Sequence, residues 1–429
     1  MEPNTTLNVD LRQMILAIET AVSLVGVDDT NHGKRVGYIA SQLGQKIGLS
    51  DSDLQYVFEL GMLHDCGVST TQMHQNLVNH FNWKDAHIHC EIGYRLLKDF
   101  PPLQKFALPI RYHHTPWQEL AALNLSFYDA QMANLIYLAD RIDVLGAAHY
   151  ESDILLACQD IHEEINRYSG SYFDPVLVDA FHKASDSEAF WIALQNRHVT
   201  RYTWDMGRLA SNHMLSLNEI KHLSLILAYI VDQKSQFTAQ HSVRVADVAR
   251  FLGEAYGLSA EQCIRIEIAG LLHDLGKLLT PDEILEKPGP LDHIERSIIN
   301  QHSYETYEIL RHIQGMEEIA RWAAFHHEGL NGVGYPFHPQ KQELSIEARI
   351  IAVADVFQAL VQNRPYREGM SLTDVLTIID EMANDGKLDK ALTGLVHQTA
   401  QQCYDIAQGS DPNGNQQHIR QFLEAPVVA

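Results

Sequence analysis

The chain carries one pattern of histidine and aspartate residues twice, with a period of about 210 residues. His64 follows His32 by 32 residues, and His273 follows His241 by the same 32 residues. The intervals between the later histidines and aspartates of the two copies are equal or differ by only a few positions. Because unrelated domains have no reason to keep a common register, the repeat predicts two copies of one fold.

The length of the chain agrees with a tandem of two domains. At 429 residues it exceeds the usual size of a single domain, and each copy is long enough to bury its own core. We expect a first domain at residues 1–196 and a second domain at residues 205–429. The segment 197–216 is polar with weak periodicity, which is typical of a linker or a connecting helix.

Hydrophobic periodicity predicts that both copies are helical. Apolar residues recur at helical spacing after His241, at Val245, Val248, Ala249, Leu252 and Tyr256. Gly257 should end this helix, and Ser259 with Gln262 should form a capping box for the next one. The first copy has Gly48 and Ser50 at the matching place. Since strand-like alternation is scarce, the expected fold class is all-α, with two tandem helical domains.

His273 and Asp274 stand side by side at the end of an apolar run, where a buried ionisable pair is costly unless a partner or a metal neutralises it. The second copy contains seven candidate metal ligands: His241, His273, Asp274, His302, His326, His327 and Asp355. One ion usually takes about four to six donors, so this number favours a dinuclear centre, whose usual chemistry is in-line hydrolysis of phosphate esters. Imidazole with carboxylate suits iron, manganese, cobalt, nickel or zinc, and the absence of a nearby cysteine argues against a structural zinc cage.

The adjacent histidines constrain the local structure. Neighbouring residues inside a helix point about 100° apart and do not easily share an ion. We therefore expect His326 and His327 at a helix end, with each imidazole serving a different metal or face.

The first copy keeps candidate ligands for a second metal site: His32, His64, Asp65, His89, His113, His114 and Asp140. It has Val68 where the second copy has Lys277, and Thr115 where the second copy has Glu328. No Gly-Tyr-Pro sequence follows its histidine pair. The first copy therefore loses groups that could handle a phosphate, and we expect it to regulate or to dimerise, with metal binding retained.

Charge and cysteine content exclude several classes of protein. A formal net charge of -23 argues against binding to nucleic-acid polymers or to an anionic membrane surface. Five cysteines without CxxC spacing argue against a disulfide framework and favour a reducing compartment. The N-terminus lacks the features of a signal peptide, and no apolar stretch reaches the roughly 18 to 20 residues that span a bilayer. These features predict a cytoplasmic protein.

Residues 217–404 resemble the HD-GYP phosphohydrolases, a branch of the HD-domain superfamily. The resemblance depends on an ordered set of motifs: His241-Ser242-Val243-Arg244-Val245-Ala246, His273-Asp274-Leu275-Gly276-Lys277, His302, His326-His327-Glu328, Gly334-Tyr335-Pro336, Asp355 and Arg364-Pro365-Tyr366-Arg367. A lone His-Asp dipeptide would be a weak signal, whereas this order of motifs is a strong one.

The resemblance implies roles for individual residues. Asp274 would bridge two divalent metal ions, with manganese or iron favoured and nickel, cobalt, magnesium or zinc also compatible. The loop Gly334-Tyr335-Pro336 would lie beside the metals and the substrate pocket. Lys277 would act in catalysis and, with Arg364 and Arg367, would neutralise the phosphate oxygens of the substrate.

The family further implies a role in bacterial second-messenger signalling. The expected reaction is hydrolysis of a 3′,5′ linkage of a cyclic dinucleotide, 3′3′-cyclic GMP-AMP (3′3′-cGAMP) or cyclic di-GMP, to a linear 5′-phosphorylated dinucleotide. A tandem of an HD copy and an HD-GYP copy resembles the bacterial 3′3′-cGAMP phosphodiesterases in particular. Two alternatives remain open: a scaffold that binds a cyclic dinucleotide without turnover, and a mononucleotidase like other HD-domain proteins. A homodimer would fit the expected dimerising role of the first copy.

Overall fold

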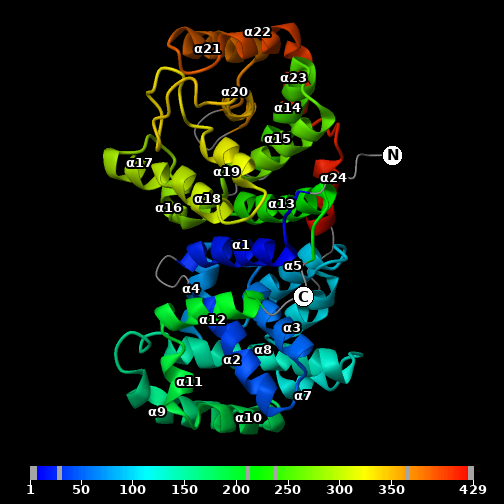
Figure 1. The fold of residues 1–429 in the computed structure, drawn as a ribbon, viewed down its shortest axis with the longest axis vertical. Helices are drawn as coiled ribbons and strands as arrows, with labels where there is room; N and C mark the ends of the chain where they lie inside the picture. The colour runs from blue at the N-terminus through cyan, green and yellow to red at the C-terminus, as the bar shows by residue number, and fades with distance from the viewer. Residues whose placement is uncertain (1–6, 27–30, 209–212, 235–239, 364–367, 424–429) are drawn as a thin grey trace. The chain divides into compact units, whose positions relative to one another are not determined.

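The computed structural model describes residues 7–26, 31–208, 213–234, 240–363 and 368–423. The regular secondary structure of these ranges is helical, and the only extended pairings are two isolated bridges, Asp10 with Met214 and Ser169 with Phe173 (Figure 1). The prediction of an all-α fold is therefore confirmed. Among the described residues, no helix combines the length and the apolar character needed to cross a membrane.

The described chain divides into two compact units, and the division falls inside helix α1 (Leu11–Ser23). The N-terminal unit contains residues 18–68 and 72–208, and the C-terminal unit contains residues 7–17, 69–71 and 213–423. Residues 7–17 belong to the C-terminal unit because their backbone pairs with its first residues: Leu11 N donates to His213 O, and Leu215 N donates to Val9 O.

After α1 and the 3-10 turn η1 (Leu24–Gly26), the N-terminal unit contains eleven helices. They are α2 (His32–Lys46), α3 (Asp51–Leu63), α4 (Thr71–Asn79), α5 (His87–Leu97), α6 (Gln104–Tyr112), α7 (Trp117–Leu120), α8 (Phe127–Gly146), α9 (Ile154–Arg167), α10 (Pro175–Ser185), α11 (Glu188–Ile192) and α12 (Asn196–Arg208). Helix α12 covers most of the segment predicted as a linker or connecting helix.

The C-terminal unit contains twelve helices and one 3-10 turn in the described residues. They are α13 (Leu217–Asp232), α14 (His241–Tyr256), α15 (Ala260–Leu272), η2 (Leu275–Leu279), α16 (Asp282–Leu285), α17 (His293–Asn300), α18 (His302–Leu310), α19 (Glu317–Ala324), α20 (Ile346–Val361), α21 (Leu372–Asn384), α22 (Lys390–Gln398), α23 (Ala400–Gln408) and α24 (Asn415–Leu423).

The helix ends and N-caps lie where the sequence predicts them. Gly257 ends α14 with φ of 94°, in the left-handed region that glycine adopts without strain. Ser259 then accepts a hydrogen bond from Gln262 N while the Gln262 side chain bonds back to the Ser259 backbone, so the predicted capping box is confirmed. In the other unit Ser50 caps α3 in the same way, by accepting from Asp53 N.

Equivalent helices pack together in the two units. In the N-terminal unit α2 packs on α3 and α8, and α5 packs on α6. In the C-terminal unit α14 packs on α15 and α20, and α18 packs on α19. The repeat read from the sequence therefore corresponds to a repeated arrangement of five helices.

The helix at the centre of each arrangement is buried on nearly all sides. In α20, Ile350, Ile351, Val353, Ala354 and Phe357 have no exposed surface, and in α8 the same is true of Leu135, Ile136, Tyr137, Leu138 and Ala139. A helix that is apolar all round belongs in a core. Each of these helices nevertheless carries one of the predicted aspartate ligands, Asp355 or Asp140, within that apolar surface.

Candidate metal centres

Five helices of the C-terminal unit bring the seven predicted ligands together, six of them at helix ends and one within a helix. His241 is the first residue of α14, His273 and Asp274 follow the end of α15, and His302 is the first residue of α18. The remaining three are His326 and His327, just beyond α19, and Asp355, in the middle of α20. Six of the seven are buried, and His327 is half-buried.

The two carboxylate oxygens of Asp274 face different sets of imidazoles. Oδ2 lies 3.3 Å from Nε2 of His273 and 3.7 Å from Nε2 of His241. Oδ1 lies 3.5 Å from Nε2 of His302 and 3.8 Å from Nε2 of His326. Asp274 thus stands between two donor groups, an arrangement that suits a carboxylate shared by two cations.

The donor atoms form two groups that could each hold an ion. One group is His241, His273 and Asp355, and the other is His302, His326 and His327; within each, the donor atoms lie within 4.8 Å of one another. The prediction that the adjacent histidines stand at a helix end is confirmed, because α19 ends at Ala324. We expected each imidazole to serve a different metal or face; the turn places the two rings 4.0 Å apart at their centroids, and the donor atoms of both group with that of His302.

Hydrogen bonds at the helix ends test whether these residues fit a cation. Nδ1 of His302 donates to Ile299 O at 2.6 Å, and Nδ1 of His326 donates to Ala323 O at 2.6 Å. In the neutral rings both Nε2 atoms therefore carry lone pairs, yet they face each other at 3.2 Å. Two lone pairs at this distance repel unless a proton or a cation lies between them, so the donor set fits a metal.

Orphaned polar atoms support the same conclusion. His273 Nδ1 donates to Gly270 O at 2.7 Å, and its buried Nε2 has no hydrogen bond to any residue that the structure describes. Asp274 Oδ1 is also buried without a hydrogen bond from the described residues. Since leaving a buried polar group unsatisfied costs about 1–3 kcal/mol, these atoms need a ligand of another kind.

The protonation states of His302, His327 and Asp274 match those that metal binding requires. Burial lowers the pKa of His302 to about 3 and that of His327 to about 4, so both rings are neutral near pH 7. Burial alone would raise the pKa of Asp274, but His273 and Lys277 lower it well below its usual value. Neutral imidazoles and ionised carboxylates are the forms that bind divalent cations.

Lys277 and the glycine-rich loop border this centre. Lys277 lies in η2 and donates to Asp274 Oδ2, and its side chain is 21% exposed, so its ammonium also reaches solvent. Gly334, Tyr335 and Pro336 are half-buried, and the Tyr335 ring lies 4.8 Å from the ring of His327. A Cβ at position 334 would come within 2.4 Å of Glu328 Cα, so only glycine fits there.

Glu328 holds this loop in place, a role that the sequence analysis missed. Its Oε1 accepts hydrogen bonds from Phe337 N at 2.6 Å and His338 N at 3.2 Å. The position of Glu328 directly after the histidine pair was the available signal. The two predicted substrate residues Arg364 and Arg367 lie outside the described residues.

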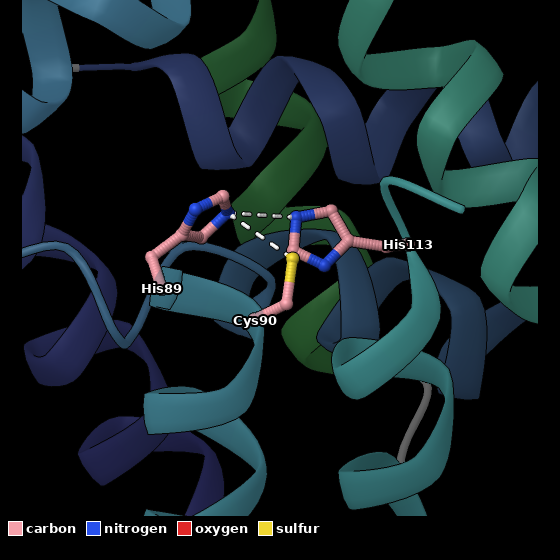
Figure 2. A group of neighbouring side chains, drawn as sticks. All are labelled: His89, Cys90 and His113. Carbon is pink, nitrogen blue, oxygen red and sulfur yellow. Dashed lines mark hydrogen bonds between the residues drawn. The ribbon is translucent and has the colours of Figure 1, made fainter. Parts of the chain in front are cut away.

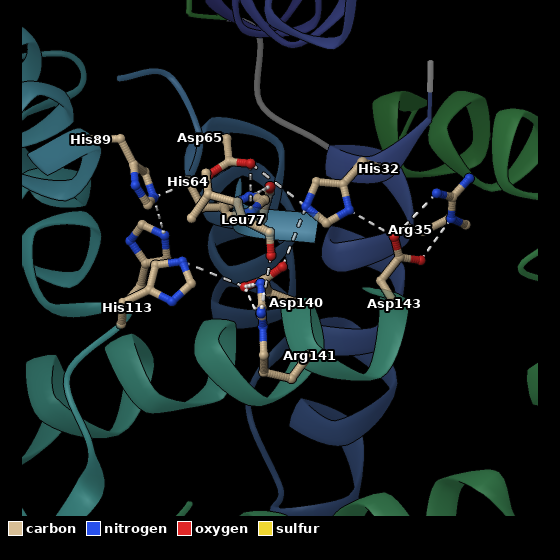
Figure 3. Close-up of polar contacts among 12 residues, drawn as sticks. His32, Arg35, His64, Asp65, Leu77, His89, His113, Asp140, Arg141 and Asp143 are labelled. Atoms are coloured by element: carbon tan, nitrogen blue, oxygen red, sulfur yellow. Dashed lines mark hydrogen bonds and ion pairs between the residues drawn. The ribbon is translucent and has the colours of Figure 1, made fainter. Parts of the chain in front are cut away.

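The N-terminal unit assembles its seven candidate ligands in the same way (Figure 3). Asp65 Oδ2 lies 3.5 Å from Nε2 of His64 and 3.7 Å from Nε2 of His32, while Asp65 Oδ1 lies 3.3 Å from Nε2 of His89. His113 Nε2 faces His89 Nε2 at 3.1 Å. His32 and His114 approach Asp140 at 3.4 and 3.6 Å. This second donor set is therefore as complete as the first.

The residues around the donors differ between the units. Asp143 accepts from His32 Nδ1 at 2.7 Å and binds the Arg35 guanidinium, which orients the His32 ring with Nε2 toward the centre (Figure 3). Gln358 occupies the matching place in the C-terminal unit, three residues after Asp355, and neither of its side-chain polar atoms makes a hydrogen bond within the described residues. The sequence analysis missed Asp143, although its spacing from Asp140 was visible.

The two units also differ in the residue that follows the aspartate of the central helix, which is Arg141 in the N-terminal unit. Its guanidinium donates to Asp140 Oδ2 at 2.9 and 3.1 Å and to the carbonyls of Leu77, His80 and Phe81 (Figure 3). Val356 follows the matching aspartate in the C-terminal unit and cannot do this. One oxygen of Asp140 is thus already paired with a cationic side chain.

Comparison with known proteins agrees with the repeated fold. Two family models, both described as HD domain, match residues 30–148 and 226–392. The 3′3′-cGAMP-specific phosphodiesterase 1 of Vibrio cholerae is 38% identical over 414 residues, which are 95% of this chain and 96% of that protein.

Other relatives match in part or in fold alone. The cyclic di-GMP phosphodiesterase response regulator RpfG of Xanthomonas campestris is 37% identical over 173 residues, 40% of this chain and 46% of that protein. The crystal structure of a cyclic GMP-AMP-specific phosphodiesterase of V. cholerae, V-cGAP3, matches with a TM-score of 0.63 at 24% identity, over 92% of this chain and 98% of that one. At this identity the match supports the fold.

Proposed function

The chain belongs to the HD-domain family, and on that basis we propose that its C-terminal unit is a metal-dependent phosphodiesterase that hydrolyses a 3′,5′ linkage of a cyclic dinucleotide. The product is a linear dinucleotide with a 5′-phosphate. A relative that matches over nearly the whole chain is named for 3′3′-cGAMP, and we infer this substrate first; cyclic di-GMP, named in relatives that match over shorter stretches, is the alternative.

The observation that carries this proposal is the division of the donors around Asp274. One divalent ion would be held by His241, His273 and Asp355, and the other by His302, His326 and His327, with Asp274 offering one oxygen to each group: Oδ2 to the first and Oδ1 to the second. Manganese and iron are the ions we favour, since imidazole with carboxylate suits both. When bound, two such ions activate water near neutral pH and withdraw charge from phosphoryl oxygens.

Lys277 supplies a cation from the protein itself. Its ammonium is held beside Asp274 and is partly exposed, so one of its three N–H groups can donate to a phosphate oxygen while another stays on the carboxylate. It would bind the charge that grows on the phosphate as the linkage opens.

Tyr335 lies beside the second donor group. Burial raises the pKa of its phenol, which therefore stays protonated and can donate a hydrogen bond to the substrate. Its ring beside His327 also offers a flat apolar face for a nucleobase. Glu328 and Gly334 keep this loop close to the donors through the contacts described above.

For the N-terminal unit we propose a regulatory or dimerising role in a cytoplasmic homodimer. Its sequence has Val68 in place of Lys277 and Thr115 in place of Glu328, and no Gly-Tyr-Pro sequence follows its histidine pair. A chain that begins at residue 205 would also lose residues 7–17 of the C-terminal unit, so the test uses the full chain. Asp65→Ala should change oligomeric mass or regulation of activity, and unchanged values of both would oppose this role.

The activity itself is tested by chromatography. Manganese-loaded full-length protein is incubated with an equimolar mixture of 3′3′-cGAMP and cyclic di-GMP, with Asp274→Ala as the control. Selective loss of one substrate, absent in the variant, would establish the reaction and its preference. If both substrates persist while metal remains bound, the binding scaffold or the mononucleotidase replaces the phosphodiesterase.

A further inference from the structure

A cysteine stands beside the donors of the N-terminal unit. Cys90 directly follows His89 in α5, at the place where Ser303 follows His302 in α18. Cys90 Sγ lies 3.7 Å from Nε2 of His89, and Ser303 Oγ lies 3.2 Å from Nε2 of His302. The two units thus present a sulfur and a hydroxyl, respectively, at the same point of the same donor set.

The distances around Cys90 match those between ligands of one ion. His89 Nε2 lies 3.1 Å from His113 Nε2 and 3.3 Å from Asp65 Oδ1, and the donors of His89, Cys90 and His113 all lie within 4.8 Å of one another (Figure 2). Tetrahedral zinc, with bonds of about 2.0 Å to nitrogen and about 2.3 Å to sulfur, would separate two nitrogens by about 3.3 Å and nitrogen from sulfur by about 3.5 Å. Both expected separations are within about 0.2 Å of those observed.

Hydrogen bonds among the described residues do not satisfy all the buried polar atoms of this cluster. His113 Nδ1 donates to Ile110 O at 2.6 Å, so in the neutral ring its Nε2 is a lone pair directed at His89. Within the described part of the chain, Nδ1 of His89, Nε2 of His64 and Oδ1 of Asp65 are buried without a hydrogen bond. His89 and His113 have no exposed surface, and Cys90 is 1% exposed, so water does not replace the missing partners from bulk solvent.

We propose that the N-terminal unit binds a divalent cation that favours sulfur ligands, such as zinc, with Cys90 as a thiolate ligand beside His89, His113 and Asp65. Cys90 gives up its thiol proton to solvent when the ion binds. Thiolate favours zinc over manganese and magnesium, which prefer oxygen ligands, so the two units differ in the metal they select. The C-terminal unit has Ser303 in this place and keeps a nitrogen and oxygen donor set.

The surroundings favour a structural or regulatory ion over a hydrolytic one. Arg141 already occupies one oxygen of Asp140 with two hydrogen bonds, which weakens that carboxylate as a ligand for a second cation. Val68 stands in place of the lysine that would bind a phosphate. The inference does not depend on the proposed activity, because it concerns only ligands of the N-terminal unit.

The test uses cobalt(II) added to metal-free, full-length protein. A cobalt–thiolate bond produces a charge-transfer absorption in the near ultraviolet, which imidazole and carboxylate ligands do not produce. We expect this absorption in the unsubstituted chain and its loss in Cys90→Ser, which places the hydroxyl of the other unit at position 90. Zinc retained after gel filtration should fall by about one ion per chain in the same variant.

Two other cysteines provide matched controls. Cys158→Ser changes a half-exposed thiol in α9 and should leave the absorption unchanged. Cys66→Ser changes a buried thiol next to Asp65 and should also leave it in place. Circular dichroism of each variant verifies that the helices are retained.

Absence of the absorption in fully cobalt-loaded unsubstituted protein would overturn the proposal, as would its persistence in Cys90→Ser. If the absorption is lost in Cys66→Ser and kept in Cys90→Ser, the thiolate ligand is Cys66, and the proposal is overturned too. If Cys90→Ser does not fold, X-ray absorption of the zinc-loaded, unsubstituted chain decides: a sulfur neighbour at about 2.3 Å supports a thiolate ligand, and its absence contradicts one. None of these measurements requires substrate turnover.

Discussion

Replacing Lys277 with methionine removes one positive charge from the C-terminal centre while keeping most of the side-chain volume. Lys277 donates to Oδ2 of Asp274 and is partly exposed beside the donor groups. Asp274 also faces the Nε2 atoms of four histidines, so it stays in place as a ligand without the lysine. The substitution therefore separates the handling of phosphate charge from the binding of metal.

The size of the effect follows from the position of the ammonium. Two unit charges about 4 Å apart interact by about 4 kcal/mol at the effective dielectric constant of about 20 that applies near a protein surface. Because the Lys277 side chain is 21% exposed and shares its charge with Asp274, we expect about 2–4 kcal/mol of transition-state stabilisation to be lost. This corresponds to a decrease in kcat/KM of about 30- to 1000-fold.

The assay compares initial rates of cyclic dinucleotide hydrolysis with metal content measured on the same samples. Metal per chain should be unchanged in Lys277→Met, and Lys277→Arg should recover part of the rate because it restores the charge. Lys341→Met removes an exposed lysine elsewhere in the C-terminal unit and controls for the change in net charge. Loss of metal from Lys277→Met, or a rate within about threefold of the unsubstituted protein, would refute the assigned role.

Three further predictions concern the same unit. Gly334→Ala forces the loop away from Glu328 and should lower kcat/KM by about tenfold or more with metal retained. Gly394→Ala is the control and should have no effect, because its Cβ would meet nothing within 4 Å. Equal rates in both variants would contradict the role of the loop. Asp274→Asn replaces one carboxylate oxygen with an N–H donor that repels cations, so metal analysis should show at least one ion lost per chain, and full metal content would contradict a shared carboxylate. The pKa values of His302 and His327 are lowered to about 3 and about 4. Below about pH 6.5 the unfolded chain therefore binds more protons at these residues than the folded chain does. Each residue should lower the stability of the metal-free protein by about 2 kcal/mol as the pH falls from about 7 to about 5. In urea titrations, the free energy of unfolding of His302→Ala should depend less on pH than that of the unsubstituted protein. An equal or larger dependence would contradict the lowered pKa of His302.

Much of the fold was predictable because its signals are local. The stop at Gly257 and the capping box of Ser259 and Gln262 depend on residues within one turn of each other, and the structure contains both. The equal spacing of His32 to His64 and His241 to His273 predicted the repeat, since it reflects one helix pair used twice.

The details of the sites were less predictable because they depend on residues far apart in the chain. Asp143 orients His32 across 111 residues, and residues 7–17 join a unit whose main part begins at residue 213. Cys90 was passed over because cysteines were judged by CxxC spacing, whereas its neighbours in space come from other helices.

The sequence by itself determined which residue types stand at each helix end, and therefore that two sets of histidines and aspartates exist. Only the tertiary structure decided how each set is divided, because the free nitrogen of an imidazole depends on which carbonyl its other nitrogen meets. His302 and His326 donate from Nδ1 to the turns that precede them, so their Nε2 atoms meet beside one oxygen of Asp274. Spacing along the chain carries no information about that meeting, which the packing of α18 against α19 produces.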